Sequence, residues 1–136
     1  MNKSFAFKLV FIIVLILLFS SIIAWYYRFY RPDFVKEKAS QEFQAVNDDY
    51  NKAQNSSQFQ EVRERAEILL NRYPSALSPR DEGMAKIVLA SSRPAAERSK
   101  MVQGLKEVIE DSKYPPDVRA FAIDILVEDY EMDFSD

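Results

Sequence analysis

The sequence predicts an all-α protein: one N-terminal transmembrane helix followed by a small bundle or stack of about five helices. The first observation behind this prediction is an uncharged apolar stretch at residues 9–27. The second is the recurrence of apolar residues every three or four positions beyond it, which is the spacing of a buried helix face. The third is that no segment alternates apolar and polar residues as a half-buried strand does.

Residues 9–27 have the length of an uncleaved membrane anchor. These nineteen residues would rise about 28 Å as a helix, close to the hydrocarbon thickness of about 30 Å. A cleaved secretory signal needs a shorter apolar core and a cleavage site of the A-x-A kind, but Ile22 stands two places before Ala24. We therefore expect the segment to remain in the mature protein and to contact the lipid bilayer.

Aromatic and basic residues follow the apolar stretch. Amphipathic rings settle at the headgroup level of a membrane, and arginine side chains reach the lipid phosphates. Residues 1–31 are thus the predicted anchor, and its predicted interface group is Trp25, Tyr26, Tyr27, Arg28, Tyr30 and Arg31.

Within the span, Ser20 and Ala24 are four positions apart on one helix face. Small residues at this spacing let a second transmembrane helix pack closely, and a lone span that faces lipid is the alternative.

The orientation of the span in the membrane is less strongly encoded. Two lysines and the amino terminus precede it and four basic residues follow it within residues 28–38, so the balance that sets topology is nearly even. A short N-terminus with two lysines is typical of a signal anchor, so we expect an extracytoplasmic domain, with a cytoplasmic one as the alternative.

The composition excludes several classes of function. The chain of 136 residues contains no histidine and no cysteine, which removes the usual ligands of zinc and copper and the usual nucleophile–base pairs. Its two glycines cannot form a phosphate-binding loop. Beyond residue 31 the chain has 14 basic and 21 acidic residues, a net charge of −7 that disfavours nucleic acid as a partner. We expect no enzyme activity, no cofactor and no metal ion.

Five amphipathic segments make up the predicted domain, residues 32–128. Each has one apolar stripe that should face the core. The predicted inward residues are Ala39, Phe43, Val46, Tyr50 and Ala53; Phe59, Val62, Ala66, Leu69 and Tyr73; Met84, Ile87, Val88 and Leu89; Met101, Leu105, Val108 and Ile109; and Val118, Phe121, Ala122, Ile125 and Leu126. Phe43 and Tyr50 are also candidates for partner docking, if the first of these helices is partly a binding surface.

Cap and stop signals separate the segments. Ser57 and Gln60 match a capping box, which predicts a helix start there. Ser78 before Pro79 predicts another start, with serine as the cap and proline at the first helical position. Ser-Arg-Pro at residues 92–94 repeats this stop-and-start pattern.

Two segments echo each other. RAEILLNRYP at residues 65–74 and LKEVIEDSKYP at residues 105–115 both end an amphipathic helix in Tyr-Pro. Superposing the Tyr-Pro pairs gives a shift of 41 residues, which lies in the range of helical-hairpin repeats. Two unrelated helix stops are the alternative.

The first of these segments also carries a family resemblance. Ala66, Leu69 and Leu70 precede Tyr73-Pro74-Ser75, and a helix with Ala85 follows. This pattern resembles the tetratricopeptide-type repeats of membrane-anchored bacterial envelope proteins, over roughly residues 60–130. The resemblance implies a TPR-like, α-solenoid scaffold that binds other proteins.

The last residues, 129–136, are acidic and aromatic. Tyr130, Met132 and Phe134 alternate with acids, and no basic residue occurs after Arg119. We expect this tail to dock on a basic, apolar partner groove. A soluble, frayed end of the last helix is the alternative.

Together these features favour a single-pass, membrane-anchored interaction module, either a scaffold or an accessory subunit of a membrane complex. Its expected partners are other proteins, with lipid contacts through residues 9–27. The alternative is a regulatory or sensor subunit whose helical domain responds to a ligand.

Overall fold

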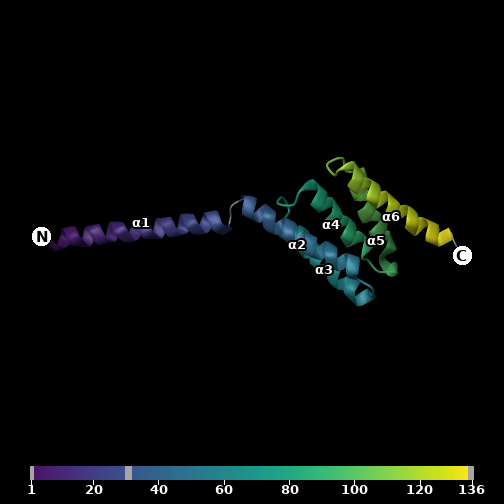
Figure 1. Cartoon of the computed structure of the whole chain (residues 1–136), viewed down its shortest axis with the longest axis horizontal. Coiled ribbons are helices and arrows are strands. Elements are labelled where there is room, and N and C mark those ends of the chain that lie inside the picture. Colours follow the sequence, from purple (N-terminus) through teal and green to yellow (C-terminus); the bar gives the residue numbers. More distant parts are fainter. Residues whose placement is uncertain (1, 30–31, 135–136) are drawn as a thin grey trace. The chain divides into compact units, whose positions relative to one another are not determined.

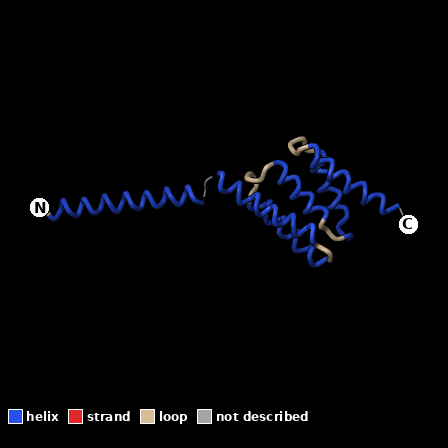
Figure 2. The backbone as a smooth tube through the Cα atoms, viewed as in Figure 1, coloured by secondary structure: helices blue, strands red, loops and turns tan. Residues whose placement is uncertain are grey.

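The computed structural model describes residues 2–29 and 32–134 of the chain (Figure 1). Within these ranges the ordered elements are helices, and no strand occurs (Figure 2). The predicted all-α fold class is confirmed for this part of the chain. The chain divides into two compact units, Met1–Val35 and Lys36–Asp136.

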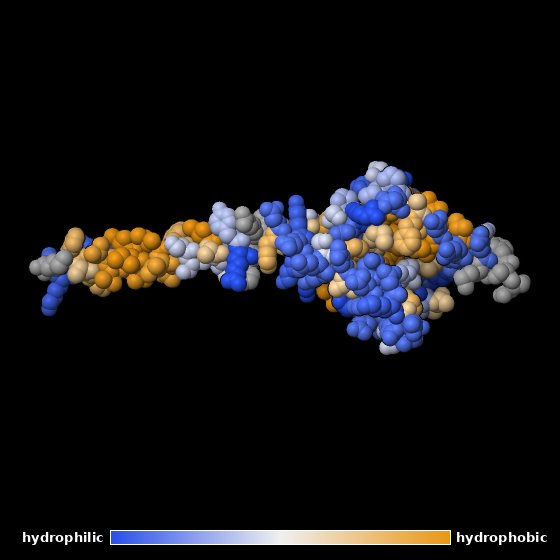
Figure 3. Space-filling view, in the orientation of Figure 1, coloured by the Kyte–Doolittle hydropathy of each residue, from blue (hydrophilic) through white to orange (hydrophobic). Residues whose placement is uncertain are grey.

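The first unit contains α1, Lys3–Phe29. The uncharged stretch predicted as the anchor lies inside this helix, which is long and apolar enough to cross a membrane. Its 27 residues correspond to a length of about 40 Å. The side chains described along it are exposed, and in Figure 3 an apolar stretch of this helix lies between more hydrophilic ends.

The second unit contains α2 from Lys36 onward, the other four predicted helices and one additional turn of 3₁₀ helix. The helices are α2 (Pro32–Lys52), α3 (Ser56–Arg72), α4 (Pro79–Ser91), α5 (Arg98–Glu110) and α6 (Pro116–Phe134), and the turn is η1 (Ala95–Glu97). The expected tail boundary at residue 129 is not a helix end, because α6 continues to Phe134.

The helix starts agree with the sequence in one case and correct it in another. Ser78 caps α4 as predicted, its Oγ accepting a hydrogen bond of 3.1 Å from the Asp81 amide. The predicted capping box at Ser57 is wrong. Asn55 caps α3 instead, because its Oδ1 accepts from the amide of Gln58 at 3.0 Å. Gln58 completes a reciprocal pair by accepting from the amide of Gln54 at 2.7 Å.

Helix α4 lies at the centre of the domain. It contacts α3, α5 and α6, and its Val88 joins a core cluster with Val46 of α2 and Val62 of α3. A second cluster joins α4 to α5 and α6 through Ile87, Leu105 and other buried residues. Because neighbours cover it on several sides, α4 carries buried residues around most of its circumference rather than on one stripe.

Small residues let the neighbours of α4 approach closely. Gly83 is the clearest example: a Cβ atom there would lie 2.9 Å from side-chain carbons of both Tyr114 and Val118. Gly83 therefore leaves room for the Tyr114 ring, which is only 2% exposed. The sequence patterns did not mark either residue as part of the core.

Most of the predicted core is buried, including Leu69, Ile87 and Leu105. Others, such as Ile109 and Ile125, are partly buried against it, and Phe121 is 40% exposed. The buried side of α6 passes through Val118 and Ala122, and Phe121 lies at its edge. The prediction that Phe121 belongs to the core is therefore wrong.

Candidate functional site

A groove between α3, α4 and α5 is the most distinctive surface feature of the domain. Leu70 of α3, Leu89 and Ala90 of α4 and several residues of α5 line it. Its volume is about 360 Å³. The walls come from residues far apart in sequence, so no single motif encodes the groove.

A close helix contact underlies the groove. Gly104 of α5 packs on Ala90 of α4, where a Cβ atom on Gly104 would lie 3.0 Å from the Ala90 Cβ. Two small residues at this point bring the helix backbones together. The surface at the contact is consequently apolar.

Basic side chains border this apolar surface. Lys86, Arg93 and Lys100 line the groove, against a single lining carboxylate, Glu107. Outside the lining, Glu97 is shared by two of the cations, with its Oε1 3.6 Å from Arg93 Nη1 and 3.2 Å from Lys100 Nζ. In a domain with an excess of acids, the groove is a local concentration of positive charge.

The two Tyr-Pro segments form similar ion-paired contacts. After α3, the Tyr73 hydroxyl donates to Glu42 Oε1 of α2 at 3.1 Å. Arg72 lies beside it, with its Nη1 3.6 Å from Glu42 Oε2. Burial raises the pKa of Tyr73, and the hydrogen bond to Glu42 raises it further.

After α5, Lys113 takes the place of Arg72. Its Nζ lies 2.9 Å from Glu82 Oε2 of α4 and 5.0 Å from the ring centroid of Tyr114. Burial alone would raise the pKa of Glu82, but Lys113, Tyr114 and the charge of Lys86 together outweigh it, so the pKa of Glu82 is lowered. The same hydrogen bond raises the pKa of Lys113.

In both places a basic residue and a buried tyrosine precede proline. A glutamate of the preceding helix forms an ion pair with the basic residue. The connections to the next helix differ. Four residues lie between Pro74 and the first residue of α4, whereas α6 starts directly after Pro115. This difference explains why the sequence echo fades outside the Tyr-Pro pairs. A common repeat remains a prediction.

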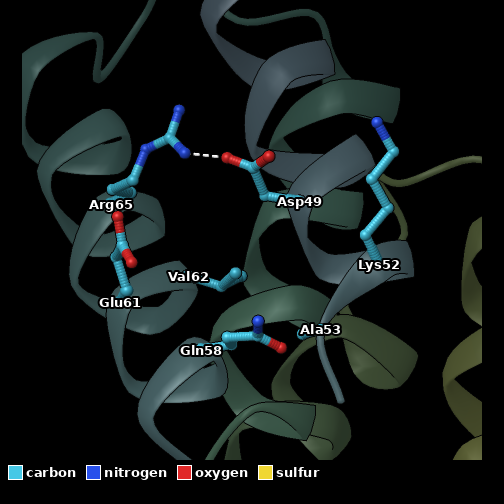
Figure 4. Close-up of a pocket in the computed structure, with 7 residues that line it drawn as sticks. All are labelled: Asp49, Lys52, Ala53, Gln58, Glu61, Val62 and Arg65. Atoms are coloured by element: carbon cyan, nitrogen blue, oxygen red, sulfur yellow. Dashed lines mark hydrogen bonds and ion pairs between the residues drawn. The ribbon is translucent and has the colours of Figure 1, made fainter. Parts of the chain in front are cut away.

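A second cavity, of about 210 Å³, lies between α2 and α3. Figure 4 shows Arg65 of α3 reaching across to Asp49 of α2, with Val62 below them. Lys52 and Glu61 also line the cavity, so its charges are mixed and its main ion pair is already made. This arrangement joins the two helices and leaves less unpaired charge than the groove does.

The predicted docking residues of the domain do not come together. Phe43 is buried in the core, and half-buried Tyr50 packs edge-on against Phe59 with ring centroids 6.0 Å apart. Tyr130 is 62% exposed on α6. The side chains of Met132 and Phe134 lie outside the described residues.

The predicted membrane residues lie on α1. Trp25, Tyr26, Tyr27 and Arg28 occupy its last turns, and Tyr30 and Arg31 fall outside the described residues. The rings of Tyr26 and Tyr27 meet edge to face with centroids 6.0 Å apart. Ser20 and Ala24 are exposed on the same helix, one turn apart.

In the part of the chain that the structure describes, no group of three or more acidic side chains is placed to hold a metal ion. Comparison with protein families, with curated proteins and with solved structures finds no match to this chain. Over the described ranges, the fold and the surface define the class: an all-helical protein with one helix apolar enough to cross a membrane and a basic, apolar groove.

Proposed function

We propose that this chain is a single-pass membrane protein whose helical domain, on the extracytoplasmic side, binds other proteins as a scaffold or accessory subunit. The observation that carries the proposal is the groove of α3, α4 and α5, which combines an apolar surface with three basic side chains. The length and composition of α1 support the anchor.

The chemistry of the groove favours an acidic amphipathic segment as its ligand. Leu70, Leu89 and Ala90 offer apolar contact, while Lys86 and Lys100 can donate charge-assisted hydrogen bonds. A helix that inserts its apolar face into such a groove is a common mode of peptide recognition. Because the cations are at the surface, binding should weaken as salt screens them.

The sensor alternative has one observation in its favour. The groove volume of about 360 Å³ falls at the low end of the range for small-molecule sites, about 300–1,000 Å³. A small anion with an apolar body would fit the same side chains. A thermal-shift screen of small carboxylates tests this alternative separately.

The test uses full-length protein in mild detergent and a synthetic amphipathic helix with Leu and Phe on one face and Glu on the other. Fluorescence anisotropy measures its Kd. We expect Lys86→Ser with Lys100→Ser to raise the Kd at least about tenfold, since a hydrogen bond to a charged group contributes about 1.5–3 kcal/mol.

Lys106→Ser is the matched control, because Lys106 is an exposed lysine of α5 that does not line the groove. A peptide with Lys in place of Glu should bind weakly. An unchanged Kd in the groove variant, or equal binding of the basic peptide, would refute the proposed site.

A further inference from the structure

Helix α6 has a second apolar face in addition to the one that packs in the domain. Val118 and Ala122 face α4 and α5 and are buried. Ile123 and Val127 are on a different side and are 44% and 47% exposed. With Tyr130, which is 62% exposed, they occupy positions i, i+4 and i+7, the spacing of a helix face that docks on a partner. We call Ile123, Val127 and Tyr130 the outer face of α6.

The surroundings of this outer face are acidic. Exposed Asp124 and Glu131 lie next to it by helical geometry. The single basic residue of α6, Arg119, uses its Nε to donate to the Ile109 carbonyl oxygen at 2.8 Å. Asp129 is turned toward α5, with its Oδ2 2.9 Å from Arg98 Nε.

The outer face and the groove are therefore complementary in two respects. Both present apolar side chains, and the acids of one match the lysines and arginine of the other. Two outer faces placed together would instead bring carboxylates against carboxylates, which is unfavourable. Charge thus favours a head-to-tail contact between copies over a symmetric one.

We propose that the outer face of α6 in one copy occupies the groove of α3, α4 and α5 in a second copy. This inference rests on the proposed function, since the groove is the same site, and it names a second copy of the chain as the partner. Each contact leaves one groove and one outer face free, so copies assemble into rings or open rows. The proposed anchor favours this assembly by confining the copies to one membrane, which raises their effective concentration.

Charge reversal tests the proposal in full-length protein in detergent, with association measured by sedimentation velocity. Lys86→Glu with Lys100→Glu reverses the groove, and Asp124→Lys with Glu131→Lys reverses the charge beside the outer face. Each double variant alone should associate at least about tenfold more weakly than the unchanged chain. A mixture of the two should recover association, because each reversed surface then meets a complementary one.

Matched apolar variants test the packing part of the contact. Val127→Ser should weaken association, whereas Phe121→Ser should not, because exposed Phe121 lies off the outer face on the same helix. Equal loss in both variants would overturn the assignment of the face. Association that survives both charge reversals, or a mixture that fails to recover it, would overturn the head-to-tail contact.

The acidic peptide separates this inference from the proposed function. If the unchanged protein binds the peptide but the copies do not associate, the groove remains a binding site and its partner is a different protein. If peptide binding is absent as well, both proposals fail.

Discussion

Helices α4 and α6 begin with similar sequences, but neighbouring elements cover them differently. Each starts with proline, and each has a fully buried alanine six positions later, Ala85 in α4 and Ala122 in α6. Counted in the same way, the outer face of α6 occupies the positions that line the groove in α4 and just after it. Lys86 corresponds to Ile123, Ala90 to Val127 and Arg93 to Tyr130.

The two helices differ in whether a neighbouring element covers this face. In α4 the position of Ala90 is covered by Gly104 of α5, whereas in α6 the equivalent Val127 is 47% exposed. A helix at the end of a stack needs a polar outer side unless another element covers it. The comparison teaches that a face which α5 covers in α4 is exposed in α6, and a second copy is the element that we propose to pack there.

The largest predicted difference between the two helices is in stability. Ile87→Ala in α4 should lower the free energy of unfolding by about 2–5 kcal/mol, because it removes a fully buried side chain and leaves a cavity. Ile123→Ala in α6 should cost less than about 1 kcal/mol, because Ile123 is 44% exposed and few contacts are lost. Urea unfolding of full-length protein in detergent measures both, at a concentration where the copies are separate. Similar costs for the two variants would mean that the outer face of α6 is part of the domain core.

A smaller effect concerns acid stability. The pKa of Glu82 in α4 is held below its ordinary value of 4.5. Its ionised form therefore adds stability that is complete above about pH 4.5 and is lost as the pH falls through the lowered pKa. We expect the unchanged protein to lose more stability than Glu82→Gln between about pH 6 and pH 3.

Asp117 of α6 supplies the control for this comparison. Arg80 lowers its pKa, but both side chains of this ion pair are more than half exposed, so solvent screens the pair. Asp117→Asn should change the acid profile less than Glu82→Gln. The reverse order would contradict the assignment of Glu82–Lys113 as the stronger contact.

The sequence predicts the helices well because their apolar spacing and proline stops are local signals. Ala66 and Leu69, four and seven positions beyond Val62, specify the buried face of α3 without reference to the rest of the chain. The cap at Asn55 was missed because Ser57 with Gln60 satisfies the same local pattern. Only the backbone geometry distinguishes the two starts.

The core and the groove depend on contacts that local patterns do not contain. Tyr114 follows α5 in a proline-rich turn, and it is buried because Gly83, far away in sequence, leaves space for its ring. The groove joins Leu70, Leu89 and Gly104 from three helices. The outer face of α6 was hidden for another reason: a helix that is apolar on two sides shows no single stripe.

The central claim is that the outer face of α6 meets the groove of another copy, and unique thiols test it most directly. The chain has no cysteine, so Ser99→Cys in the groove and Glu131→Cys on α6 each introduce one reactive group at an exposed position. Each variant is prepared as full-length protein, and one of the two preparations carries a mass tag. The two are mixed and treated with a short bismaleimide. We predict cross-linked pairs that contain one copy of each variant. Few pairs should form from Glu131→Cys alone, and the yield of mixed pairs should fall markedly when Val127→Ser is added. Efficient cross-linking of Glu131→Cys with itself, or no mixed pairs, would contradict the account.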